Sequence, residues 1–227
     1  MKAKILEVCV GKPRDIILNG QTERSGIHKS PVTGSVALGL ANLAGDGQAN
    51  LKYHGGREKA VYVYSADYYP DWQRILGKDP LEPSQFGQNL TVDGFPDEAV
   101  HIGDRFRVGT ALLEVAQPRI PCAKLAARVG REGFGNEFPM AGRLGYYLYT
   151  LKTCEVQAGD NMERVRAAAH SVTVAKLCRS VFSEADDLEV IKLALEFPYV
   201  DEGWKKKTQG PSQKNWVATD LAIPYYA

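Results

Sequence analysis

The sequence predicts a mainly β fold, a barrel with peripheral helices, followed by a small unit of three helices. Up to about residue 166, short β-branched and aromatic runs alternate with glycine-containing turns, at the spacing typical of a barrel or sandwich. Beyond that point apolar residues recur at helical spacing, without the alternation of a strand. We therefore predict a β-barrel domain at residues 1–168 and a C-terminal helical domain with its tail at residues 169–227.

The elements of the first domain follow from local patterns. The expected strands are ILEVCV (5–10), SVALGL (35–40), AVYVY (60–64), NLTV (89–92), FRVG (106–109), ALLEVA (111–116) and YYLYTL (146–151). Two helices are expected among them. One covers residues 65–76 with Ser65 as its cap, and the other begins at Pro121 or Cys122 and ends before Gly130.

The second domain is expected to hold helices at residues 173–182, 186–197 and 201–207. Ser183 and Glu184 are the predicted cap of its second helix, and Pro198 disfavours continuation of that helix.

Composition limits the classes of function. The 227 residues carry 28 basic and 27 acidic side chains, and the net charge of +1 gives no reason to expect duplex nucleic acid or an anionic membrane surface as partner. Apolar runs fall far short of the roughly 20 residues of a membrane span, and the stretch before Gly11 is too short for a secretory signal. A cytoplasmic protein is therefore predicted. The four cysteines, at positions 9, 122, 154 and 178, are too widely spaced for CxxC zinc chemistry and are expected to be free thiols.

Cys122 is the candidate for a reactive thiol. A strand runs into Pro118, Pro121 blocks its extension, and Cys122 falls beside the first turn of a helix, where unpaired N–H groups favour a thiolate. Arg119 and Lys124 on either side would lower its pKa further. A buried, inert cysteine beside a turn explains the same letters, so both interpretations stay open.

Two basic clusters are candidate anion sites. One holds Lys52, His54 and Arg57 around Gly55-Gly56, and the other is the loop from Arg24 to Pro31, which includes Lys29. Ordinary turns with solvated charges would produce the same patterns. Phosphate-loop, GxGxxG, HExxH and GxSxG motifs are all absent from the sequence, which sets the corresponding enzyme classes aside.

These clusters belong to six motifs that occur in one order: RSGIHK (24–29), GDGQ (45–48), HGG (54–56), FGQNLTV (86–92), IGD (102–104) and QPRIPC (117–122). The ordered set resembles the MOSC-domain family in its YiiM branch, over residues 1–165. The helical remainder is similar to the three-helix domain that follows the MOSC domain in that branch. The resemblance implies a MOSC-type β-barrel with a pocket for the molybdenum cofactor, a molybdenum-molybdopterin that carries a phosphate and a molybdenum–oxo group.

The resemblance also implies roles for residues. Cys122 aligns with the cysteine whose thiolate binds the metal, and the expected catalytic residues are Cys122, His54 and Lys52. His54 would donate to an oxo group or shuttle a proton, and Asn89 would either bond the pterin or only hold a strand turn. The expected cofactor-binding residues are Arg24, Lys29, Lys52, His54, Arg57, Asn89 and Lys124.

By the same resemblance, the activity is reductive detoxification of small N-hydroxylated compounds, including N-hydroxylated nucleobase analogues. The sequence has neither an iron–sulfur cysteine set nor a flavin fingerprint, so an external electron-donor protein is expected. A homodimer is also considered. The alternative is a cofactor or sulfur carrier in which Cys122 acts without reductase turnover, because MOSC domains also occur in molybdenum-cofactor sulfurases. A metal-free module that binds an anion is a third interpretation.

Overall fold

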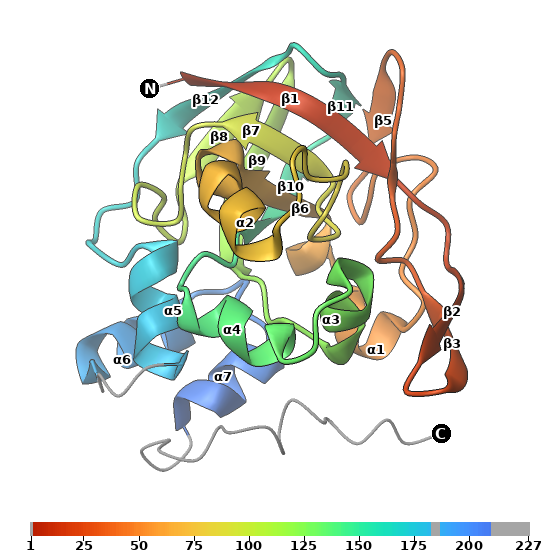
Figure 1. Cartoon of the computed structure of the whole chain (residues 1–227). Coiled ribbons are helices and arrows are strands. Elements are labelled where there is room, and N and C mark those ends of the chain that lie inside the picture. The colour runs from red at the N-terminus through yellow and green to blue at the C-terminus, as the bar shows by residue number, and fades with distance from the viewer. Residues whose placement is uncertain (1, 183–186, 210–227) are drawn as a thin grey trace.

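The structure, a computed structural model, describes residues 2–182 and 187–209. Within them, seven strands close a β-barrel in the order β1, β12, β8, β9, β10, β6, β7 and back to β1 (Figure 1). Neighbouring strands of the barrel are antiparallel except β6 and β7, which run parallel. The barrel strands are β1 (Lys2–Val10), β6 (Val61–Ser65), β7 (Leu90–Asp93), β8 (Arg105–Val108), β9 (Ala111–Pro118), β10 (Tyr146–Lys152) and β12 (Asn161–Arg166).

Short pairs of strands extend from the barrel. They are the β2–β3 hairpin (Arg14–Leu18 and Gln21–Ser25), β4 (Ser30–Pro31) on the edge of β1, and β5 (Val36–Leu38) paired with β11 (Cys154–Val156). The hairpin turns at Asn19 and Gly20, both with positive φ, as a two-residue turn requires.

Helices cover the barrel and one of its ends. They are α1 (Leu51–His54), the 3-10 turns η1 (Arg57–Lys59) and η2 (Ala66–Tyr68), α2 (Tyr69–Leu76), α3 (Ala123–Val129), α4 (Phe134–Met140), α5 (Val174–Phe182), α6 (Leu188–Glu196) and α7 (Glu202–Gln209). Every residue of β6 is buried, because helices α2 and α4 bring an aromatic cluster against it. Within that cluster the Trp72 indole N–H donates to the Tyr64 hydroxyl at 2.6 Å.

The mainly β, barrel-type fold with peripheral helices is confirmed. Ser65 caps the 3-10 turn that leads into α2, and α3 ends at Gly130, which has a left-handed conformation, as expected. The predicted strand at residues 35–40 shortens to β5 and pairs with β11 outside the barrel. Strands β2, β3 and β12 were not predicted: β3 and β12 are largely polar, and β2 is a short strand, mostly exposed, that backbone pairing with β3 holds in place.

Helix α4 was also missed, because Gly135 and Pro139 both disfavour a helix in its sequence. Phe134 and Phe138, which lie four residues apart, are fully buried in the aromatic cluster and stabilise the helix through tertiary packing.

The three C-terminal helices are present, and Phe197 ends α6 before Pro198. The predicted cap at Ser183 and Glu184 lies outside the described residues; the observed N-cap of α6 is Asp187, whose carboxylate accepts from the Val190 N–H at 3.1 Å. Apolar residues of α5, α6 and α7 join the same hydrophobic cluster as the barrel strands. The tail from residue 210 also lies outside the described residues, and among the described helices none has the length and apolar character of a membrane span.

Candidate functional site

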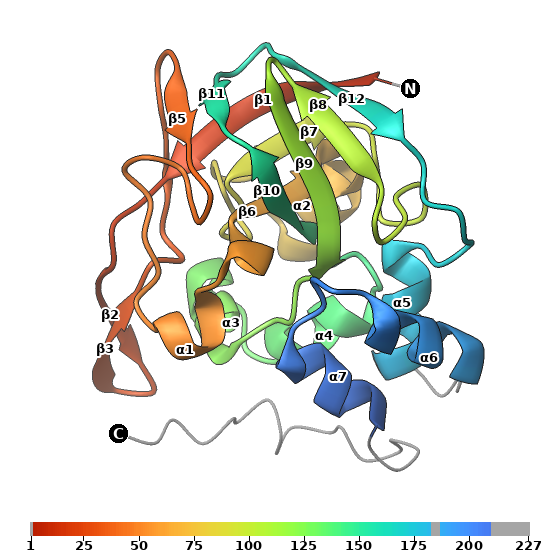
Figure 2. The same cartoon turned by 180° about the vertical axis from the view of Figure 1, so that it is seen from behind.

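An open pocket is lined by residues of α1, α3 and the segment after β9. Figure 2 shows these elements together at one end of the barrel. The empty space of the pocket, including its open mouth, is about 660 Å³. Its polar and aromatic wall consists of Ser25, Lys29, Asp46, Gln48, His54, Lys59, Tyr62, Asn89, Arg119, Cys122, Lys124 and Tyr147.

Glycines let the loops of this wall approach each other. A Cβ on Gly26 would stand 2.3 Å from the carbonyl oxygen of Gly47, so a larger residue there would push the two loops apart. Gly87 adopts a φ of +80°, and a Cβ on it would meet Ile27 at 2.9 Å. All four residues line the pocket, so its shape depends on these close contacts.

Cys122 is at the pocket wall, as the N-cap residue of α3. It is a free, half-buried thiol whose side chain makes no capping hydrogen bond, so the sulfur is available to a ligand. The predicted position beside the first turn of a helix is confirmed. Burial raises the pKa of the Cys9 thiol to about 12, and it also raises the pKa values of Cys154 and Cys178.

Arg119 brings a buried positive charge to the same pocket. Its guanidinium donates to the carbonyl oxygen of Phe86 and lies 4.9 Å from the centre of the Tyr62 ring. Burial lowers the pKa of Arg119, but Tyr62, Tyr147 and Cys122 outweigh it, and the net direction is upward. Among the residues that the structure describes, no carboxylate forms an ion pair with Arg119, so its charge favours an anion in the pocket.

Each lysine of the pocket forms an ion pair with a carboxylate. Lys29 pairs with Asp46, Lys59 with Asp201 at 2.5 Å, and Lys124 with Glu23 at 3.1 Å. All three lysines are largely buried, and a buried ammonium without a partner would be costly. The carboxylates therefore compensate the burial of these lysines and hold their ammonium groups at the wall of the pocket.

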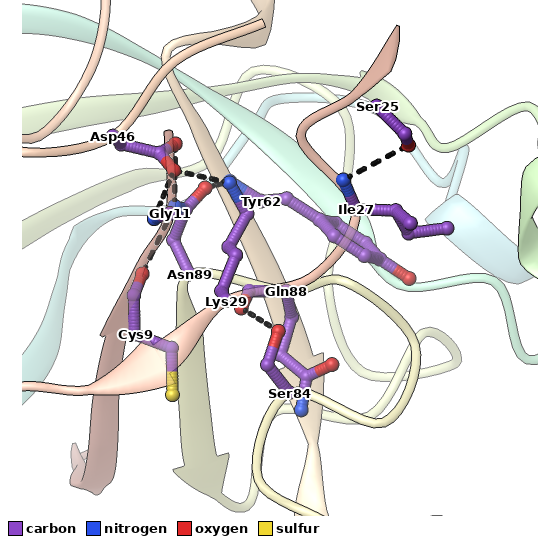
Figure 3. A network of polar contacts seen from close by, with 10 residues as sticks. All are labelled: Cys9, Gly11, Ser25, Ile27, Lys29, Asp46, Tyr62, Ser84, Gln88 and Asn89. Carbon is purple, nitrogen blue, oxygen red and sulfur yellow. Dashed lines mark hydrogen bonds and ion pairs between the residues drawn. The ribbon is translucent and has the colours of Figure 1, made fainter. Parts of the chain in front are cut away.

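Asp46 is the centre of a buried network beside the pocket (Figure 3). Besides Lys29, its carboxylate accepts from the Gly11 N–H at 3.0 Å and from the Asn89 side-chain amide at 2.9 Å. The Asn89 amide also donates to the carbonyl oxygen of Cys9 and accepts from the Tyr62 N–H. Asn89 therefore connects the strand ends of β1, β6 and β7, and it also lines the pocket, so the predicted contact with a pterin stays a prediction.

His54, the last residue of α1, faces the cationic part of the pocket. Burial, together with the positive charges of Arg119, Lys59 and Lys124, lowers its pKa to about 4, against a smaller opposing effect of Asp201. His54 is therefore neutral near pH 7 and presents one hydrogen-bond donor and one acceptor.

Five of the eight predicted site residues line the pocket: Lys29, His54, Asn89, Cys122 and Lys124. The other three side chains lie elsewhere. Arg24 is exposed and pairs with Asp15, Lys52 lies over the ring of Tyr53, and Arg57 donates to the carbonyl oxygen of Thr150.

Several pocket residues were not among the predicted site residues, namely Asp46, Gln48, Lys59, Tyr62, Arg119 and Tyr147. Asp46 and Gln48 belong to the GDGQ motif and Arg119 to QPRIPC, so these motifs contained a usable signal. Lys59, Tyr62 and Tyr147 have no local signal, because they lie in or beside strands and reach the pocket only through the barrel.

Comparison with protein families places residues 50–163 in the MOSC domain. The chain belongs to the MOSC-domain family. The uncharacterized protein YflK of Bacillus subtilis is 37% identical over 88% of this MOSC chain and 90% of its own length. A protein of Gibberella moniliformis named as a reductase is 30% identical over 87% of this chain, which spans only 35% of that longer protein. The crystal structure of YiiM from Geobacillus stearothermophilus is similar with a TM-score of 0.76 and 26% identity, over 91% of this chain and 97% of that one.

Proposed function

We propose that this MOSC protein is a molybdenum cofactor-dependent reductase of small N-hydroxylated compounds, including N-hydroxylated nucleobase analogues. One observation carries the proposal: the free Cys122 thiol shares a pocket with the buried Arg119 guanidinium, whose charge no described carboxylate neutralises. A thiolate suits a thiophilic metal, and an unbalanced cation suits a phosphate or oxo group. Membership of the MOSC family and the similarity to a named reductase are consistent with this activity.

The residues present fit such a group. Cys122 would bind the metal, while Arg119, Lys59 and Lys124 would hold the phosphate and the oxo face. The cofactor would supply two-electron oxygen-atom transfer when bound. Lys29 and Asn89 are engaged with Asp46 and would support the wall.

The chain itself would handle protons and substrate position. Reduction of an N-hydroxyl group consumes two electrons and two protons, breaks the N–O bond and releases water. Burial raises the pKa of Tyr147 to about 12, so its hydroxyl keeps its proton at neutral pH and can donate a hydrogen bond to an oxygen in the pocket. Neutral His54 can accept a proton on one ring nitrogen and donate from the other. The electrons would come from an external donor protein, in a cytoplasmic setting.

The test measures molybdenum and pterin per chain after expression in cells that make the cofactor. Cys122→Ala should lose most of the metal, whereas Cys154→Ala, which removes a half-buried free thiol from β11, should match wild type. Loaded wild type should then reduce an N-hydroxylated nucleobase with a reduced viologen as electron donor. Full metal and activity in Cys122→Ala would refute the proposal. A loaded protein without turnover would instead support the carrier function.

A further inference from the structure

Residues of the segment at the start of α7 contact the pocket residue Lys59 and the end of strand β9, although they belong to the predicted helical domain. Asp201 forms the ion pair with Lys59, and both side chains are nearly buried, at 13% and 12% exposed. The Trp204 indole N–H donates to the carbonyl oxygen of Pro118 at 2.8 Å, four residues before Cys122, the N-cap of α3. Figure 2 shows this segment passing the end of β9 before α7 begins.

Gln117 and Asp201 are joined by two hydrogen bonds. The Asp201 N–H donates to the Gln117 side-chain oxygen at 2.7 Å, and the Gln117 amide donates to the Asp201 carboxylate at 3.1 Å. The other carboxylate oxygen accepts from the Trp204 N–H at 2.9 Å. These hydrogen bonds fix Asp201 at the end of β9, so the position of its carboxylate does not depend on Lys59.

Lys59 depends on this carboxylate for its position. Its ammonium also donates to the carbonyl oxygen of Tyr53 at 2.8 Å, which connects it to α1, the helix that carries His54. Burial raises the pKa of Asp201, but the positive charge of Lys59 and the hydrogen bonds from Lys59, Trp204 and Gln117 together outweigh this, so the net direction is downward and Asp201 is ionised at neutral pH. Without the carboxylate, Lys59 would lie close to two other pocket cations and would be repelled toward solvent.

The same segment supports the other end of η1. The ring of Tyr199 stacks on the ring of Tyr149, with centroids 4.0 Å apart and an interplanar angle of 16°. The Arg57 guanidinium lies 4.6 Å from the centre of the Tyr149 ring. Both ends of the short turn Arg57–Lys59 are thus connected to the segment 199–204. Lys59 pairs with Asp201 directly, and Arg57 lies over the Tyr149 ring, which stacks on Tyr199.

We propose that Asp201 is a positioning residue of the pocket: it holds the Lys59 ammonium at the wall, where Lys59 binds an anionic group of the cofactor. The C-terminal helices are then part of the binding site and not an appendage. This inference rests on the proposed function for the identity of the ligand, but the ion pair can be tested without it.

The first experiment compares the rate at which Lys59 is acetylated in the folded apoprotein, followed by peptide mass spectrometry. Asp201→Asn keeps the size of the side chain and one acceptor oxygen, which can still cap α7, and it removes the negative charge that pairs with Lys59. It should speed acetylation of Lys59 several-fold, because the lysine loses its partner and becomes more accessible to the reagent. Asp201→Glu should return the rate toward wild type. Glu202→Gln, which removes the adjacent exposed carboxylate that pairs with Lys205, should change nothing.

The second experiment measures molybdenum and pterin per chain in the same variants. Asp201→Asn and Lys59→Gln should each lower occupancy several-fold, while Glu202→Gln keeps it. An unchanged acetylation rate in Asp201→Asn, or faster acetylation with wild-type occupancy, would overturn the inference. If wild type itself carries no cofactor, the proposed function fails separately. The affinity of apoprotein for inorganic phosphate then replaces occupancy, and an equal affinity in wild type and Asp201→Asn would overturn the positioning role.

Discussion

Replacing Asp46 by alanine tests whether the buried network of Figure 3 stabilises the protein. The substitution removes the partner of Lys29 and leaves an ammonium whose side chain is only 8% exposed. It also removes the acceptor of the Gly11 N–H and one of two acceptors of the Asn89 amide.

The magnitude follows from the burial of the pair. Breaking a buried ion pair by removing one partner costs about 3–5 kcal/mol, and each buried donor left without an acceptor costs about 1–3 kcal/mol. Part of this cost is avoided, because burial already lowers the pKa of Lys29 and the unpaired ammonium can release its proton. We therefore expect Asp46→Ala to lower the free energy of unfolding by about 4 kcal/mol, or the melting temperature by about 8–16 °C for a chain of this size.

The assay is urea unfolding followed by tryptophan fluorescence and circular dichroism. Asp15→Ala is the matched control, because its partner Arg24 is 65% exposed and the ion pair is 3.4 Å long, so the loss should stay below about 1 kcal/mol. The double variant Lys29→Met with Asp46→Leu should recover much of the lost stability, since no buried charge remains unpaired. Equal losses for Asp46→Ala and Asp15→Ala would refute the argument.

Two further predictions concern the rest of the fold. Burial raises the pKa of Asp97 to about 7, so the proton binds more tightly in the folded state; the resulting stabilisation is complete below about pH 4 and is lost as pH rises through 7. Urea unfolding of wild type at several pH values should show that the free energy of unfolding falls by up to about 4 kcal/mol over that interval. In Asp97→Asn this dependence on pH should be much weaker, and an equally steep dependence in both proteins would contradict the assignment to Asp97. Trp204→Ala, at a fully buried indole, should cost about 3–5 kcal/mol in the same assay, whereas half-exposed Tyr53→Ala should cost far less.

Local patterns in the sequence were sufficient for most of the barrel. Strands β6 and β10 are rich in β-branched and aromatic residues, and β1 and β9 contain short apolar runs bounded by turn residues, which together favour strands. The position of Cys122 was also local, because Pro121 and Gly130 define the start and the end of α3.

The composition of the pocket was decided by tertiary structure. Arg57 and Lys59 are two residues apart in one turn, yet Arg57 bonds a strand carbonyl while Lys59 reaches the pocket. Local sequence cannot predict this difference between Arg57 and Lys59, because it comes from the ion pair of Lys59 with Asp201. The fold brings Asp201 to Lys59 from a distant part of the chain.

The sequence by itself therefore determined most of the barrel strands, the limits of α3 and the residue types available for chemistry. Which lysines became pocket residues was settled only when distant carboxylates came within ion-pair distance, since a nearly buried ammonium is costly without a charged partner. That pairing is a property of the folded arrangement and leaves no periodic signal along the chain.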